Sequence, residues 1–197
     1  MALTLRSFSG RDAIPHFDDL ARLRIAVFRD FPYLYDGDSD YERHYMETYA
    51  RSEGSLFVLV FDGETIVGAS TGTPMTAETD EVTAPFLAAG HDPAQFFYFG
   101  ESVLLPAYRG QGIGVGFFDR REAQAKKLGL RFAAFCAVER PLDHKRRPAD
   151  YQPLDAFWAK RGYTRHPELH TTFSWRDLDE AAESPKPLTF WIRDLGA

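Results

Sequence analysis

One stretch near the middle of the chain restricts the fold more than any other. Residues 103–114 read Val-Leu-Leu-Pro-Ala-Tyr-Arg-Gly-Gln-Gly-Ile-Gly, and an amphipathic pattern follows them. This order predicts an apolar strand that ends at a proline, a glycine-rich turn and then a helix. Glycines let the backbone approach a ligand closely, and the first N–H groups of a helix have no partner within it. Such a turn is suited to bind an anion such as phosphate or pyrophosphate.

Spacing excludes two common phosphate-binding motifs. The G-x-G-x-x-G motif of dinucleotide-binding proteins would need its third glycine at Val115 or at Phe117. A P-loop needs a lysine directly after its last glycine, and this segment contains no lysine. The pattern that remains is Arg109-x-x-Gly112-x-Gly114.

Composition narrows the class of protein further. A length of 197 residues predicts one domain over residues 1–197, and 44% hydrophobic residues are enough for a substantial core. A net charge of −6 argues against a nucleic-acid partner. Cys136 is the only cysteine, which excludes an intramolecular disulfide and a cysteine metal cage. The start lacks the pattern of a signal peptide, and no apolar run approaches the ~20 residues of a membrane span, so we expect a cytoplasmic protein without a membrane partner.

Periodicity predicts an alternation of strands and helices. Strands are expected at residues 3–8, 55–61, 65–73, 96–105, 132–138, 171–175 and 188–192. Helices are expected at residues 14–28, 39–50, 113–128 and 154–161. Residues 74–95 are predicted to be irregular, with a short helix at 84–89. Ser39 or Asp40 is expected to cap the second helix.

The glycine motif and this order of elements resemble the GNAT superfamily of N-acetyltransferases. In that family an R/Q-x-x-G-x-G/A loop holds the pyrophosphate of acetyl-CoA after a strand that often ends in proline, and Pro106 precedes Arg109 by three residues. The run Phe-Trp-Ala-Lys-Arg-Gly-Tyr at 157–163 resembles the family's late helix. The resemblance covers nearly the whole chain. It implies an α/β fold with a mixed, mostly antiparallel central sheet and helices on both faces.

The resemblance also implies a function and a binding site. It implies direct transfer of an acetyl group from acetyl-CoA, as co-substrate and without a metal, to a primary amine of a small molecule or peptide in a ternary complex. A homodimer is a family-level expectation. A backbone amide near residues 103–105, where a bulge splays the strand, is expected to bind the oxyanion. The residues expected to bind the co-substrate are Val103, Leu104, Leu105, Arg109, Gly110, Gln111, Gly112, Ile113 and Gly114.

Glu101 is the predicted general base. A carboxylate in an otherwise apolar strand has a raised pKa unless it is paired. Related acetyltransferases carry an acidic residue at this place, facing the acceptor amine. The alternative is that Glu101 forms an ion pair with a neighbouring arginine. Ser102 is expected to point to the opposite face of the strand and to be structural.

The late helix departs from the family pattern at Trp158. The family usually has a tyrosine there that protonates the leaving thiolate, whereas an indole can only donate a hydrogen bond. Tyr151 is the preferred substitute, with Tyr163 or water as alternatives. Packing roles for both tyrosines also stay open.

Other constellations predict little chemistry. The acidic run 36–40 lacks the glycine of a calcium loop, because Tyr41 stands in its place. Residues 145–147 form a basic cluster that either meets the 3′-phosphate of CoA or is solvated. A metal site at His166 and His170 is disfavoured by the intervening proline.

The sequence leaves the acceptor unassigned and two functional alternatives open. A catalytically silent module that binds or senses acyl-CoA would explain Trp158. An enzyme that uses a longer acyl donor is the other alternative. Small amines, amino acids, antibiotics and protein N-termini all remain possible acceptors, because the acceptor pocket in this fold is built from loops.

Overall fold

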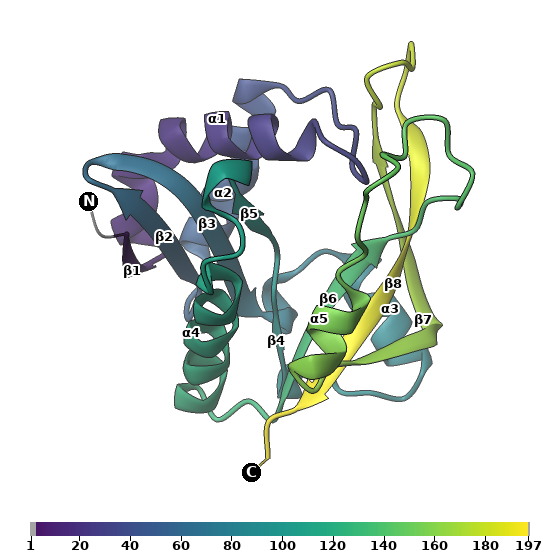
Figure 1. Cartoon of the computed structure of the whole chain (residues 1–197). Helices are drawn as coiled ribbons and strands as arrows, with labels where there is room; N and C mark the ends of the chain where they lie inside the picture. The colour runs from purple at the N-terminus through teal and green to yellow at the C-terminus, as the bar shows by residue number, and fades with distance from the viewer. Residues whose placement is uncertain (1–2, 197) are drawn as a thin grey trace.

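The computed structural model describes residues 3–196 and places eight strands in one sheet (Figure 1). The strands are β1 (Thr4–Ser9), β2 (Leu56–Asp62), β3 (Thr65–Pro74), β4 (Phe96–Tyr98), β5 (Ser102–Leu104), β6 (Phe132–Val138), β7 (Thr164–Trp175) and β8 (Ser184–Asp194). Their order is β1-β2-β3-β4-β6-β8-β7, and β5 also pairs with β3. Only the β4–β6 pair is parallel, so the mixed, mostly antiparallel sheet is confirmed.

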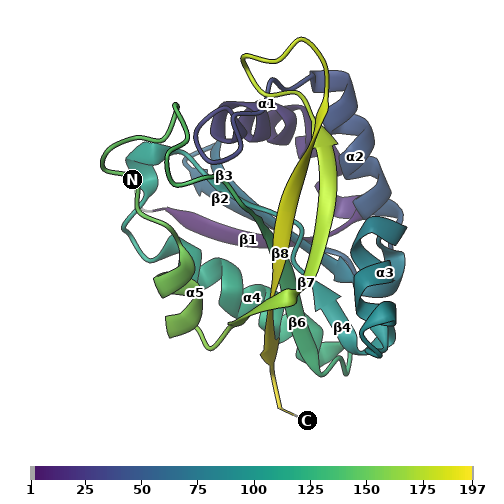
Figure 2. The same cartoon turned by 90° about the vertical axis from the view of Figure 1, so that its right-hand side faces the viewer.

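Helices cover both faces of this sheet (Figure 2). They are α1 (Phe17–Phe28), α2 (Ser39–Arg51), α3 (Asp80–Ala88), α4 (Ile113–Lys127) and α5 (Asp155–Lys160). Strand β2 shows why two covered faces are needed, because all its residues except Asp62 are buried. Val58 and Val60 pack on the α4 side, whereas Phe57 and Leu59 pack against α1 and α2. Because side chains on both faces of this strand are buried, its sequence is a continuous run of apolar residues.

The sheet splits between β5 and β6. Strand β4 pairs with β6 only up to Tyr98 and Ala134, and beyond that point β6 pairs with β8 alone. Strand β5 stays with β3, so the two halves of the sheet diverge, as Figure 1 shows. The prediction of one strand over 96–105 is therefore wrong in one respect. The chain changes partners in its middle, which no local pattern of hydrophobicity reveals.

Several element ends also differ from the prediction. The segment Arg11–His16, which contains Pro15, forms a 3₁₀ turn, and the first helix starts at Phe17 rather than at Ile14. Asp38 caps α2, because its carboxylate accepts the amides of residues 40 and 41. Strand β7 starts before residue 171, at Thr164, and a shift in its register between His166 and His170 accommodates the proline.

The open end of the split is bridged by the Arg140 clamp, which we define as Arg140 with its three partners. The guanidinium of Arg140 donates to the carbonyls of Pro32 and Tyr33, each at 2.7 Å, and to Asp177 at 2.8 and 2.9 Å. The first two residues lie between α1 and α2, and Asp177 lies in the β7–β8 turn. Tyr35 also forms a bridge with Asp177. The clamp thus joins the two diverging halves. Within residues 3–196, no helix is long and apolar enough to cross a membrane.

Candidate functional site

The glycine loop ends in a helix start without a side-chain cap. Gly110 and Gly112 have φ angles of 78° and 80°, and Gly112 is the N-cap of α4. No side chain accepts from the first turn of the helix, and no atom lies within 4 Å of where a Cβ of either glycine would stand. The helix dipole and these free amides favour an anion in the open space beside the loop. Gln111 is exposed, whereas Ile113 anchors the helix start in the core.

Arg109 binds the strand that leads into this loop. Its Nε donates to the carbonyl of Leu104 at 3.2 Å, so the side chain folds back toward β5. The amide of Leu105 donates to Val67 of β3. Because bonded residues alternate in an antiparallel pair, the backbone groups of Leu104 face away from β3, into the split. Among the amides of residues 103–105, that of Leu104 is the one available to an oxyanion.

A β-bulge lies earlier in the strand than the sequence suggested. Gly100 and Glu101 together oppose Thr71: the amide of Gly100 donates to the carbonyl of Thr71 at 3.2 Å, and the carbonyl of Glu101 accepts the amide of Thr71 at 3.1 Å. Two residues opposite one define a bulge, which increases local twist. The expected position at 103–105 is therefore corrected to 100–101. The lone glycine in an apolar strand was the available signal.

A buried arginine lies directly behind the bulge. Arg121 of α4 is 2% exposed, and its guanidinium donates to the carbonyls of Thr71 and Glu101 and to the hydroxyl of Ser102. Burial lowers its pKa to about 10, so it stays cationic at neutral pH. Ser102 therefore points to the α4 face, as expected, and has a structural partner there. The sequence did not single out Arg121.

Glu101 lies on the other face of the bulge and is ion-paired. Nη1 of Arg24, from α1, lies 2.7 Å from its Oε2, and Nε of Arg24 binds Glu42 of α2. All three side chains are at least nine-tenths buried. The structure therefore has the second of the two arrangements considered for Glu101, in which it forms an ion pair with an arginine. Arg24 and Tyr45 both contact Oε2 of this carboxylate, which leaves Oε1 for a further partner.

Tyrosines and a second carboxylate surround Glu101. Tyr45 donates to Oε2 of Glu101 at 3.5 Å, and Tyr49 donates to Glu78 at 2.5 Å. Tyr98 of β4 contacts Sγ of Cys136 at 3.1 Å on the same side. None of these residues belongs to a sequence motif. The four-residue spacing of Tyr45 and Tyr49, which puts both on one face of α2, was the only signal.

The three aromatic residues considered for thiolate protonation lie in different environments. Tyr163 is buried, and its hydroxyl donates to Glu122 at 3.1 Å, so it has a structural partner. The ring of Trp158 packs on Phe135 and on another tryptophan of β8, at 5.0 and 5.2 Å between ring centroids. Tyr151 is half-buried, and its ring packs on Phe31 of the α1–α2 loop at 4.7 Å. Burial raises the pKa of Tyr151.

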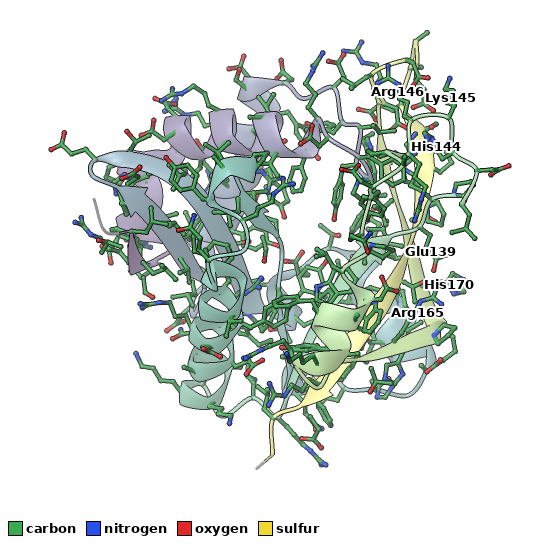
Figure 3. All side chains as sticks on the ribbon, in the orientation of Figure 1. Glu139, His144, Lys145, Arg146, Arg165 and His170 are labelled. Carbon is green, nitrogen blue, oxygen red and sulfur yellow. The ribbon has the colours of Figure 1, made fainter. Side chains whose placement is uncertain are left out.

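The basic cluster lies beside the β7–β8 turn. Lys145 pairs with Asp179 of this turn, and Arg146 lies 4.0 Å from the same carboxylate. Figure 3 shows both at the end of the molecule where this turn lies, above Glu139 and Arg165. The guanidinium of Arg147 covers the ring of Tyr151. These contacts give the cluster structural partners within the C-terminal half.

The comparisons with known proteins identify the class to which this fold and site belong. The family model described as "Acetyltransferase (GNAT) family" matches residues 20–148. The chain therefore belongs to the GNAT acetyltransferase family. A search of curated proteins finds no match to the chain.

Solved structures show the same fold over the whole chain. YncA from Salmonella typhimurium, solved with its cofactor acetyl-CoA, has a TM-score of 0.60 at 13% sequence identity. The match covers 100% of this chain and 96% of the YncA chain. PaiA N-acetyltransferase from Thermoplasma acidophilum, in complex with coenzyme A, has a TM-score of 0.57 at 13% sequence identity, and the match covers 98% of this chain and 99% of the PaiA chain. Ribosomal-protein-alanine N-acetyltransferase from Brucella melitensis has a TM-score of 0.62 at 11% sequence identity, and the match covers 97% of this chain and 99% of that protein. At these identities the likeness shows the fold alone.

Replacing Gly112 with alanine is expected to weaken binding of CoA about tenfold, or ~1.4 kcal/mol. A Cβ at φ 80° costs ~1–2 kcal/mol, and the loop then changes shape next to the helix start. Gly90→Ala is a matched control, because Gly90 has a φ of 79° and equally open surroundings. Both variants should lose similar stability to urea, whereas calorimetric titration of CoA should detect a change only for Gly112→Ala. Equal CoA affinity in the two variants would show that Gly112 does not contribute to CoA binding.

Proposed function

We propose that residues 1–197 form one acetyltransferase domain that transfers the acetyl group of acetyl-CoA to a primary amine of a small molecule or peptide, by direct attack in a ternary complex. One observation carries the proposal. An uncapped helix start with two left-handed glycines lies next to a split strand whose Leu104 amide faces the opening. This combination suits a ligand with a pyrophosphate at one end and a reactive carbonyl at the other.

The residues of this chain have distinct parts in the proposed reaction. Acetyl-CoA supplies an activated acetyl group. The amides around Gly110, Gly112 and Gly114 hold the pyrophosphate, with Arg109 fixing the loop to β5. The Leu104 amide donates to the oxyanion, and Arg121 holds the backbone of the bulge in place through its bond to the carbonyl of Glu101.

Glu101 is the proposed base, acting directly or through a water. Its free Oε1 accepts a proton from the acceptor ammonium, which leaves the nitrogen electron pair free to form the C–N bond. After that bond forms, the second N–H proton passes to water. The departing thiolate takes up one proton, and the group that donates it is reprotonated from water. Tyr151 is the proposed donor to the thiolate, because the hydroxyl of Tyr163 is already bound to Glu122.

The proposal predicts release of free thiol from acetyl-CoA when an acceptor amine is present. A panel of n-butylamine, L-lysine, an aminoglycoside and a peptide with an N-terminal alanine samples small and large amines. At least one of them should be acetylated, as detected by mass spectrometry, and acetyl-CoA should react faster than propionyl-CoA or succinyl-CoA. Calorimetric binding of CoA without turnover of any amine would instead favour the silent acyl-CoA-binding module.

A further inference from the structure

Glu78 is a second carboxylate that the reaction above does not use. It follows β3 at the end of the 3₁₀ turn Met75–Ala77 and is half-buried. Its amide donates to the carbonyl of Met75 at 3.0 Å, and Met75 is fully buried in the core. The backbone position of Glu78 is therefore fixed by the packing of the turn that precedes it.

Glu78 differs from the two carboxylates at Arg24 because it has no cation as partner. Glu42 and Glu101 share the guanidinium of Arg24. In the part of the chain that the structure describes, no arginine, lysine or histidine forms an ion pair with Glu78, and its side-chain partner is the hydroxyl of Tyr49. A carboxylate that is withdrawn from water is costly unless a cation or several donors compensate it. Glu78 is therefore suited to take a cation from a ligand.

Glu78 and Glu101 belong to one site because Tyr49 reaches the bulge. A Cβ on Gly100 would stand 2.6 Å from the hydroxyl of Tyr49, a distance that real Cβ atoms do not show. The same hydroxyl donates to Oε1 of Glu78 at 2.5 Å. Since residue 100 has no side chain, this hydroxyl lies both against the backbone beside Glu101 and against the carboxylate of Glu78.

Two aromatic rings lie between these carboxylates. Tyr45 and Tyr49 are one turn apart on α2, and their ring centroids are 5.1 Å apart. Their hydroxyls donate to different groups. Tyr45 donates to Oε2 of Glu101 at 3.5 Å, whereas Tyr49 donates to Glu78. Tyrosine rings offer apolar surface to methylene groups. The site thus has an anionic group at either end of an aromatic wall.

We propose that the acceptor is a diamine, a molecule with two ammonium groups joined by a short methylene chain. The inference rests on the proposed function, because one ammonium group must lie at Oε1 of Glu101 to be acetylated. The second ammonium group pairs with Glu78, and the methylene chain lies against Tyr45 and Tyr49. Glu78 takes no part in the bond changes. It selects the acceptor by the charge at the end that does not react.

Three four-carbon amines that differ only at the far end test this selection. 1,4-Diaminobutane carries a cation there, n-butylamine carries no charge, and 4-aminobutanoate carries an anion that Glu78 would repel. Burial raises the pKa of Glu78 to about 7, so assays at pH 8.5 keep it ionised. We expect kcat/KM to be about tenfold higher for the diamine than for the monoamine, because a charge-assisted hydrogen bond is gained, and lowest for the amino acid.

Diamines and monoamines of three, five and six carbons extend the series, so that a poor fit of one length does not decide the result. The fastest diamine should give a product with one acetyl group by mass spectrometry, because the acetamide nitrogen has no charge to offer Glu78. Equal kcat/KM for every diamine and its matching monoamine would overturn the inference, and so would a second acetyl group added as fast as the first.

Glu78→Gln tests the residue itself. The amide keeps the shape of the side chain and still accepts from Tyr49, but it has no charge. The ratio of kcat/KM for the diamine to that for the monoamine should fall about tenfold. Glu81→Gln is the matched control, because Glu81 is an exposed carboxylate in the first turn of α3, and it should keep the wild-type ratio. A purely structural role of Glu78 would lower both rates together, so a wild-type ratio in Glu78→Gln would overturn the inference.

Calorimetric titration of 1,4-diaminobutane into protein saturated with CoA separates this inference from the proposed function. CoA has no acetyl group, so binding of the diamine is measured without turnover. The wild-type complex should bind the diamine about tenfold more tightly than the Glu78→Gln complex does. Equal affinities would overturn the assignment of Glu78. Binding that depends on Glu78, in a protein that acetylates no amine, would instead contradict the proposed function alone.

Discussion

Replacing Glu101 with glutamine is expected to lower kcat for acetyl transfer at pH 7.5 by roughly 10²–10⁴-fold, the usual contribution of a general base. The amide cannot accept the ammonium proton, although it fills the same space between Arg24 and Tyr45. Steady-state kinetics with the best amine of the panel measure the effect. The affinity for CoA should stay at the wild-type value, because the glycine loop lies at the other end of β5.

The control for this variant is Glu64→Gln, at an exposed position in the β2–β3 turn. It should change neither kcat nor stability. Glu101→Asp should recover part of the lost rate, because it keeps a carboxylate at a shorter reach. An unchanged kcat in Glu101→Gln, with correct folding, would show that Glu101 is not the base.

Replacing Arg24 with methionine is expected to lower the free energy of unfolding by ~3–5 kcal/mol, the cost of breaking a buried ion pair from one side. The substitution leaves Glu42 and Glu101 without their shared cation, and both carboxylates are almost fully buried. Urea unfolding at pH 7 measures the loss.

Two further variants identify the cause of that loss. Arg22→Met is the matched control on the same helix: its partner Asp19 is exposed, so the cost should stay within ~0.5 kcal/mol. Adding Glu42→Gln to Arg24→Met should recover part of the stability, because it removes one unpaired buried charge. If the single and double variants unfold at the same urea concentration, packing rather than charge explains the loss.

The glycine loop, which is the proposed donor side of the site, could be predicted from sequence because it is local. The glycine loop, its proline and the start of α4 are consecutive, so spacing alone distinguishes them from other phosphate-binding motifs. The positions of most strands followed from apolar runs of the right length, although β7 and β8 extend beyond the predicted ends. The division of residues 96–105 into β4 and β5 could not be predicted, because it depends on which neighbour each half pairs with.

The surroundings of Glu101 were largely missed in the sequence because they are assembled from distant segments. Arg24, Glu42, Tyr49 and Glu78 come from two helices and a turn after β3, and no fixed spacing joins them to Glu101. A buried arginine on an amphipathic helix looks like any solvent-facing charge in the sequence. Only the tertiary packing of α1 and α2 over the bulge gives these side chains a shared environment.

The Arg140 clamp has a consequence for how much ligand binding costs. Strands that diverge make no hydrogen bonds with each other. Closing the gap between them would form such bonds and would stabilise the sheet. The clamp ties the α1–α2 loop to the β7–β8 turn through four hydrogen bonds of one guanidinium. The separation is thereby maintained by folding, before any substrate arrives. Ligand binding then does not have to supply the free energy of separating the strands, so the binding site is preorganised.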